Sequence, residues 1–445
     1  MIESRALIFV ATLLASMLLL APMLTAALRR TLRLMHPAVI FPVLLVYQSL
    51  VPVVTALGGD TMKITSQAFL GDPWFLVRAL AIQALAFACF LVGVRLVGTP
   101  IVAARADLWD LDHPNLPVFR GVSPAMVLVT GVLLLAGATS VKLYELQRYG
   151  GGVLESLRDI RGFIFGTGYG HYWMHVVFTS AFLIPAVLFV SSRSHGVVAL
   201  LVAAPITLLS MSKAGIIRIA TAVLTYSQAR IFRGAGGPWI AAVVASAVLL
   251  VVPRAVAVIT QTPGESVSAS RAVEALLHRE YSFELFAVIV AGDGDIGLEH
   301  SHGTWLRDEL SQLVPRALWP DKPLSRALEI GPLYMPRDFS PAVPMFVAPH
   351  LFGFLFAEGG LPGVLLGSLV VGSSLGGFYG SAHRASRRRG DRFPLLCYLC
   401  AAAGLKGLVD GGIANYVMQT VFGIGLIALW SALASTFVWL RRVSA

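Results

Sequence analysis

Residues 6–28 read ALIFVATLLASMLLLAPMLTAAL, a run without a single charged side chain. A helix needs roughly 20 apolar residues to cross a hydrocarbon core about 30 Å thick. Because the bilayer offers the backbone no hydrogen-bond partners, a run of this length must be helical. Similar runs recur along the 445 residues, of which 56% are hydrophobic and 13% charged. The sequence therefore predicts an all-α, polytopic integral membrane protein.

About eleven such runs are candidate spans. They lie near residues 6–28, 36–57, 74–97, 122–143, 173–192, 196–211, 214–231, 238–260, 346–378, 393–409 and 415–440. The ninth run is interrupted by the string Gly359-Gly360-Leu361-Pro362-Gly363. With this count, the arginine clusters between the runs all fall on one side, which places the C-terminus in the cytoplasm and the N-terminus outside.

One long polar segment separates an N-terminal bundle, 1–260, from the C-terminal spans, 346–445. This segment, 261–345, is predicted to be a large external (periplasmic) loop, and it carries 7 Lys and Arg against 12 Asp and Glu. Its patterns at 271–289 and 306–318 predict short amphipathic helices. Because the basic residues gather in short loops between spans, the net charge of +10 does not indicate a nucleic-acid partner.

Lys and Arg are normally enriched on the cytoplasmic side of a membrane protein, so each cation predicted on the external face needs a physical explanation. Arg158 and Arg161 are three residues apart, and on one helical face they could bind a diphosphate together. Lys213 and Arg218 begin an apolar run that enters the membrane from outside. A cation about one turn inside the bilayer is costly unless it faces an anion or a polar partner. Snorkelling side chains and structural ion pairs are the alternatives.

Three residues near Pro315, Pro320 and Pro323 are further candidates. Arg316 and Lys322 are cations on backbone that the neighbouring prolines restrain. Trp319 could stack on a sugar ring or anchor the loop at the membrane interface.

Two titratable residues open the ninth run. His350 is a candidate base near neutral pH, and Glu358 is a carboxylate in an apolar stretch beside two glycines. A plain polar contact is the alternative for each. The histidines at 171, 175, 300 and 302 have no accompanying carboxylate arrangement, so the sequence predicts no metal site.

No nucleotide-binding motif is present, so no cofactor is expected and the energy for a reaction must arrive in the substrate. An outward-facing, cationic site in lipid fits an activated anionic lipid, such as a lipid-linked diphosphate sugar.

Three strings resemble a known family. They are Pro315–Pro323 (PRALWPDKP), Phe356–Gly363 (FAEGGLPG) and the pair Ser212-Lys213. Together they resemble segments of bacterial Wzy-type O-antigen or oligosaccharide repeat unit polymerases, which are similar in plan to O-antigen ligases. The resemblance covers roughly residues 140–380; the first spans match only in hydropathy.

The resemblance implies metal-independent glycosyl transfer at the outer face of the bacterial inner membrane. The substrates would be undecaprenyl-diphosphate-linked oligosaccharides, and a chain-length regulator and a flippase of the same pathway are the implied partners. The cations would hold the diphosphate, and His350 would be the base by similarity to a ligase histidine. Lys213 departs from the family's usual Arg, because Lys offers a point charge and not a fork of donors.

Three other functions fit the same composition. A ligase would transfer the glycan to a different acceptor. A transporter or flippase of lipid-linked oligosaccharides would distribute its cations along a path through the membrane. A non-catalytic assembly partner would tolerate loss of Arg316 or Lys213.

Overall fold

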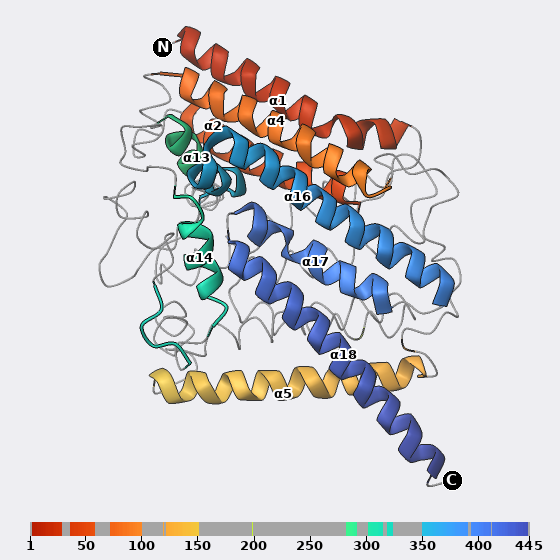
Figure 1. Ribbon diagram of the computed structural model, residues 1–445. Coiled ribbons are helices and arrows are strands. Elements are labelled where there is room, and N and C mark those ends of the chain that lie inside the picture. Colours follow the sequence, from red (N-terminus) through yellow and green to blue (C-terminus); the bar gives the residue numbers. More distant parts are fainter. Residues whose placement is uncertain are drawn as a thin grey trace, which may run out of the picture. The chain divides into compact units, whose positions relative to one another are not determined.

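The computed structural model describes residues 2–28, 36–57, 72–99, 119, 122–150, 198, 282–291, 301–314, 318–323, 349–389, 393–410 and 412–443. Every regular element among them is a helix. The helices are α1 (Ile2–Leu28), α2 (Pro37–Leu57), α4 (Trp74–Leu96), α5 (Pro124–Gly150), α13 (Ser282–Ala291), α14 (Thr304–Ser311), α16 (Leu351–Arg389), α17 (Phe393–Val409) and α18 (Ile413–Val443) (Figure 1).

The described helices confirm a helical protein with segments that can cross a membrane. Four of them are long and apolar enough to do so, over Ala6–Ala26, Trp74–Leu96, Leu351–Ala382 and Tyr416–Leu440. The predicted spans from 6 to 143 and from 346 onward all coincide with helices. The four predicted between 173 and 260 lie outside the described residues, so the count of eleven stays a prediction.

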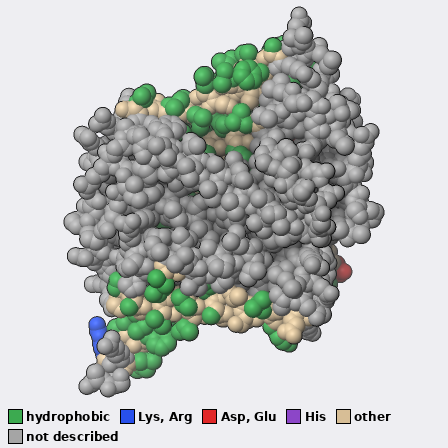
Figure 2. Space-filling view, turned by 180° about the vertical axis from the view of Figure 1, so that it is seen from behind, with side chains coloured by type: hydrophobic (Ala, Val, Ile, Leu, Met, Phe, Trp, Pro, Cys, Tyr) green, Lys and Arg blue, Asp and Glu red, His purple; other side chains and the backbone are tan. Residues whose placement is uncertain are grey.

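The described outer surface is that of a lipid-facing protein. On α1, Phe9, Leu14 and Leu18 are exposed by 57%, 57% and 64%. In the space-filling view, hydrophobic side chains gather on the described parts of the surface, among backbone and other side chains, and charged ones are sparse there (Figure 2). Water would penalise this much exposed apolar area, whereas lipid does not.

The chain forms two compact units, each assembled from distant parts of the sequence. Unit 1 contains Met1–Arg105, Val273–Phe378 and Leu405–Tyr416. The remainder of the chain forms unit 2. Unit 1 therefore joins the first spans to part of the predicted external loop and to the ninth run.

Helix α16 confirms the predicted interruption and shows what it does. Gly359 and Gly360 leave the helical conformation, and Gly360 has φ +59°, which glycine adopts without steric strain. A Cβ on Gly363 would lie 2.5 Å from the Leu355 carbonyl O, although residues eight apart in a straight helix are about 12 Å apart. The helix therefore folds back on itself. We call 351–358 the short arm and 361–389 the long arm.

The long arm packs on α4 through small residues. A Cβ on Gly372 would overlap the Phe90 carbonyl, and one on Gly93 would overlap the Leu369 carbonyl. The hydroxyl of Thr99 donates to the Gly376 carbonyl at 2.8 Å. Close backbone approach of this kind is how helices associate in lipid, where no hydrophobic force drives them together.

The short arm starts deep in unit 1 and not at its edge. Phe352 meets the Phe41 ring edge-on at 6.3 Å, and Phe41 stacks on Phe90 at 4.3 Å. His350, two residues before Phe352, is fully buried. The sequence placed His350 at the start of the ninth span, where it directly precedes the first residue of α16 in the structure.

Helix α13 differs from the prediction in its surroundings. The sequence placed it in the external loop, but it packs against α2 and α4, and Phe283, Phe286 and Ala287 are fully buried. Its sequence, SFELFAVIVA, is almost wholly apolar, so burial in the core is its most stable position. This part of the predicted loop is thus part of the helix bundle.

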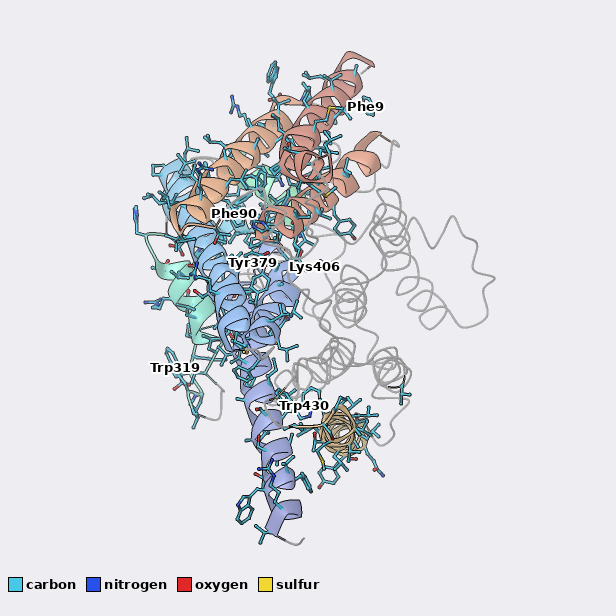
Figure 3. The ribbon with its side chains drawn as sticks, turned by 90° about the vertical axis from the view of Figure 1, so that its right-hand side faces the viewer. Phe9, Phe90, Trp319, Tyr379, Lys406 and Trp430 are labelled. Carbon is cyan, nitrogen blue, oxygen red and sulfur yellow. The ribbon has the colours of Figure 1, made fainter. Side chains whose placement is uncertain are left out.

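Unit 2 is organised around Trp430 of α18, which is fully buried. Its indole N–H donates to the Thr130 hydroxyl at 2.8 Å, and a Cβ on Gly131 would lie 2.6 Å from its ring. Phe119 meets the ring edge-on at 5.5 Å. Figure 3 shows Trp430 pointing from α18 toward α5. Because Gly131 has no side chain, the indole ring of Trp430 can pack against the backbone of α5.

Candidate functional site

Glu358 holds the N-terminus of α14. Its carboxylate accepts hydrogen bonds from the backbone N–H groups of Gly303 and Leu306, the latter at 2.5 Å. The first N–H groups of a helix have no partner within the helix, and the helix dipole favours negative charge there. Gly303 precedes the helix with φ +96° and brings no side-chain cap of its own. Glu358 therefore supplies the cap from a distant helix.

At the same junction the last backbone carbonyls of the short arm also find hydrogen-bond donors. The N–H of Ser301 donates to the Ala357 carbonyl at 2.9 Å, and the N–H of His302 donates to the Glu358 carbonyl at 3.2 Å. These carbonyls would otherwise be unpaired where the helix breaks at Gly359. Each element thus caps the other, and the fold-back of α16 and the position of α14 depend on one another.

Lys322 holds the opposite end of α14. Its side chain is buried, and its ammonium donates to the carbonyls of Val314 at 2.8 Å and Gln312 at 3.5 Å. A cation at a helix C-terminus is the favourable sign for the dipole. The side-chain amide of Gln312 adds a bond to the Pro323 carbonyl at 2.9 Å. The segment 318–323 is therefore fastened to the end of α14.

Glu358 and Lys322 are accordingly committed to backbone groups in this structure. Sequence analysis proposed the first as a catalytic carboxylate and the second as a diphosphate ligand. The structure brings both to one eight-residue helix, at opposite ends and with opposite charge. Any catalytic use of either group is still a prediction, and it would have to coexist with these hydrogen bonds.

Trp319 lies on the turn that Lys322 fastens. The N–H of Lys322 donates to the Trp319 carbonyl at 3.3 Å, and the indole is 42% exposed. In Figure 3 the Trp319 side chain projects away from the helices at the edge of unit 1. An exposed indole on a hydrogen-bonded turn is compatible with both predicted roles, a sugar contact and an interfacial anchor.

His350 lies among aromatic rings. Its imidazole stacks on Phe286 at 5.5 Å and is fully buried, and its Nδ1 accepts the N–H of Phe352 at 3.3 Å. In a neutral imidazole the proton then belongs on Nε2, which makes that nitrogen a donor. No described hydrogen-bond partner meets Nε2. Action as a base would require Nδ1 to release the Phe352 amide, so that role stays a prediction.

The other predicted site residues lie outside the described part of the chain. They are the cations Arg158, Arg161, Lys213, Arg218 and Arg316.

A polar cluster that sequence analysis missed joins α2 to the end of α17. The Lys406 ammonium lies 2.7 Å from the Asp410 carboxylate, which also accepts a hydrogen bond from the buried Gln48 amide. Next to Gln48, the Ser49 hydroxyl donates to the Gln83 side-chain oxygen at 2.8 Å. Figure 3 labels Lys406 within the helix bundle. The sequence did contain a signal for this cluster, because Lys406 and Asp410 are oppositely charged and four residues apart at the end of an apolar run.

We expect loss of Asp410 to destabilise unit 1. Asp410→Ala leaves the Lys406 ammonium, whose side chain is only 15% exposed, without this carboxylate. Because both groups keep some solvent contact, the expected loss is about 1–3 kcal/mol, less than for a fully buried pair. Thermal unfolding in detergent of Lys406→Ala, Asp410→Ala and the double variant measures the coupling. Strictly additive effects would show that the pair contributes nothing.

Comparison of the chain with family models, curated proteins and solved structures found no match.

Proposed function

We propose that this protein is a glycosyltransferase that joins undecaprenyl-diphosphate-linked oligosaccharide repeat units at the outer face of a bacterial inner membrane. The observation that carries the proposal is the meeting of two of the resembling strings at α14. Lys322, from PRALWPDKP, caps the C-terminus of this helix, and Glu358, from FAEGGLPG, caps its N-terminus. Strings far apart in sequence thus support one local structure.

In the proposed reaction, the bond between the anomeric carbon of the donor glycan and its diphosphate breaks. The diphosphate leaves with the electron pair, while a hydroxyl oxygen of the acceptor repeat unit forms the new bond to that carbon. The hydroxyl proton passes to a base. Cations near the departing diphosphate would stabilise its developing charge, and such stabilisation is strong in a site of low dielectric constant.

The helix α14 would serve this reaction by positioning the segment that begins at its C-terminus. Arg316 lies between Val314, whose carbonyl accepts from Lys322, and Leu318. Arg316 itself lies outside the described residues, and the Lys322 bond to Val314 ties the end of α14 to the segment 318–323.

Replacement of the predicted diphosphate ligands tests the proposal in cells. We expect Lys213→Ala, Arg218→Ala and Arg316→Ala each to reduce long glycan by roughly 100-fold, because the loss of one preorganised donor commonly costs that much. Glycan length on a gel, with the protein level measured in the same membranes, is the readout. Arg384→Ala removes an exposed cation of α16 and serves as the matched control. Normal glycan in all three variants would refute the site.

A second assay separates polymerase from its alternatives. The purified protein would receive lipid-linked repeat units as both donor and acceptor. A polymerase lengthens the glycan and releases undecaprenyl diphosphate, whereas a ligase needs a different acceptor and a transporter makes no covalent product. Absence of both products from folded protein would contradict polymerisation.

A further inference from the structure

Helix α14 turns two carboxylates inward and two leucines outward. Trp305, Asp308 and Glu309 are buried at 5% exposure or less, whereas Leu306 and Leu310 are 39% and 40% exposed. The two leucines are four residues apart and so share one face. A helix bordered by water normally turns its charged residues outward and its leucines inward. The exposed face of α14 therefore suits an apolar environment.

This apolar face continues into neighbouring segments. Leu318 and Trp319, just beyond the helix, are 78% and 42% exposed. At the other end, the Leu306 N–H is bonded to Glu358, three residues before Leu361, which begins the exposed side of the long arm.

The long arm itself borders lipid. Its Leu366 and Val370 are 64% and 62% exposed within a stretch apolar enough to cross the membrane. Leu361, 41% exposed, is the first residue of this arm. The spanning helix thus begins three residues after the carboxylate that binds the N-terminus of α14, whose exposed face also carries Thr304 and Arg307 beside the leucines.

We propose that α14 and the segment 318–323 dock on the outer leaflet of the membrane. The leucines would enter the boundary between headgroups and acyl chains, and Trp319 would lie at headgroup level, where indole rings are enriched. The Arg307 side chain, 71% exposed, bonds the Asp308 carboxylate through Nε and Nη2 and would lie with Trp319 at the level of the headgroups. The partner of this surface is thus the lipid itself, and the docking holds the loop at the membrane whether or not the glycosyl transfer is correct.

Spin labels on the leucine face test the docking. Single cysteines at Leu306, Leu310 and Leu318 would carry a nitroxide in full-length protein whose Cys89, Cys397 and Cys400 are replaced by Ala. The protein would be reconstituted in vesicles of phosphatidylethanolamine and phosphatidylglycerol. Molecular oxygen concentrates in lipid and a nickel chelate stays in water. Labels at Leu366 and Arg442 give the lipid and water references, and a thermal unfolding scan of each labelled protein confirms that it is folded.

We expect labels at Leu306 and Leu310 to collide with oxygen far more than with the nickel chelate, in a ratio close to that at Leu366. A ratio close to that at Arg442 would mean that the face lies in water. Exclusion of both reagents would mean that protein covers it. Either result overturns the proposal, and Leu318 provides the third position if one leucine variant does not fold.

Discussion

Gly372→Ala is expected to prevent the long arm of α16 from packing on α4. A Cβ at this position overlaps the Phe90 carbonyl of the opposing backbone, so the helices must separate. Separation also lengthens the bonds from Thr99 to Gly376 and from Ser373 to Gly93, which are 2.8 and 3.2 Å long. Overpacking costs typically 1–3 kcal/mol and such interhelical bonds about 0.6 kcal/mol each, so we expect a loss of about 2–4 kcal/mol.

Gly377→Ala, on the same arm, is the matched control for this variant. There a Cβ would meet nothing closer than Val97 at 3.9 Å, an ordinary van der Waals contact. Alanine is also the better helix former, so this variant should be neutral or slightly stabilising. The midpoint of thermal unfolding and the amount of folded protein in the membrane distinguish the two. Equal behaviour of the two variants would show that the close α4–α16 contact does not support the fold.

Glu358→Ala is expected to destabilise the N-terminus of α14 and to reduce the proposed glycan formation. Two backbone N–H groups lose their acceptor, and the negative charge at the helix N-terminus disappears. An N-cap contributes about 1 kcal/mol and charge-assisted bonds roughly twice as much, so α14 should lose about 2–3 kcal/mol. Amide hydrogen exchange over 303–311 should then become roughly 30- to 150-fold faster, since exchange reports local opening.

Glu358→Gln separates the structural role from a catalytic one. The Gln side chain keeps one oxygen that can accept an N–H bond but carries no charge. We expect intermediate exchange in α14 and partial glycan formation from this variant. If Gln abolished glycan as completely as Ala while exchange in α14 stayed at the wild-type rate, the carboxylate would act in catalysis and not as a cap.

Hydropathy was enough to locate the long helices among the described residues. The runs at 6–28, 74–97 and 415–440 match α1, α4 and α18 closely, because a bilayer forces any long apolar run into a helix that bonds its own backbone. The interruption at Gly359 was also predictable, since two consecutive glycines before Leu-Pro destabilise a continuous helix.

The hydrogen-bond partners of the site residues were harder to predict from the sequence. The sequence predicted chemical roles for Glu358 and Lys322, with a plain polar contact as the alternative for Glu358. In the structure each satisfies the end of a helix, Glu358 more than 50 residues away from Gly303 and Lys322 eight residues from Val314, and the chemical roles stay predictions. Which backbone groups lack partners depends on where helices end and meet, and neighbouring residue types do not encode that.

Taken by itself, the sequence determined that this is a helical membrane protein, where its described helices run, and that one of them breaks at Gly359. These properties depend on the transfer of side chains to lipid and on local backbone preferences, both of which act within a few turns of chain. Only the tertiary structure decided that α16 folds back, that α13 lies in the core, that α14 turns leucines outward, and that Lys406 pairs beside Gln48. These depend on packing between segments far apart in sequence, where shape and unpaired polar groups select one arrangement among many that hydropathy allows.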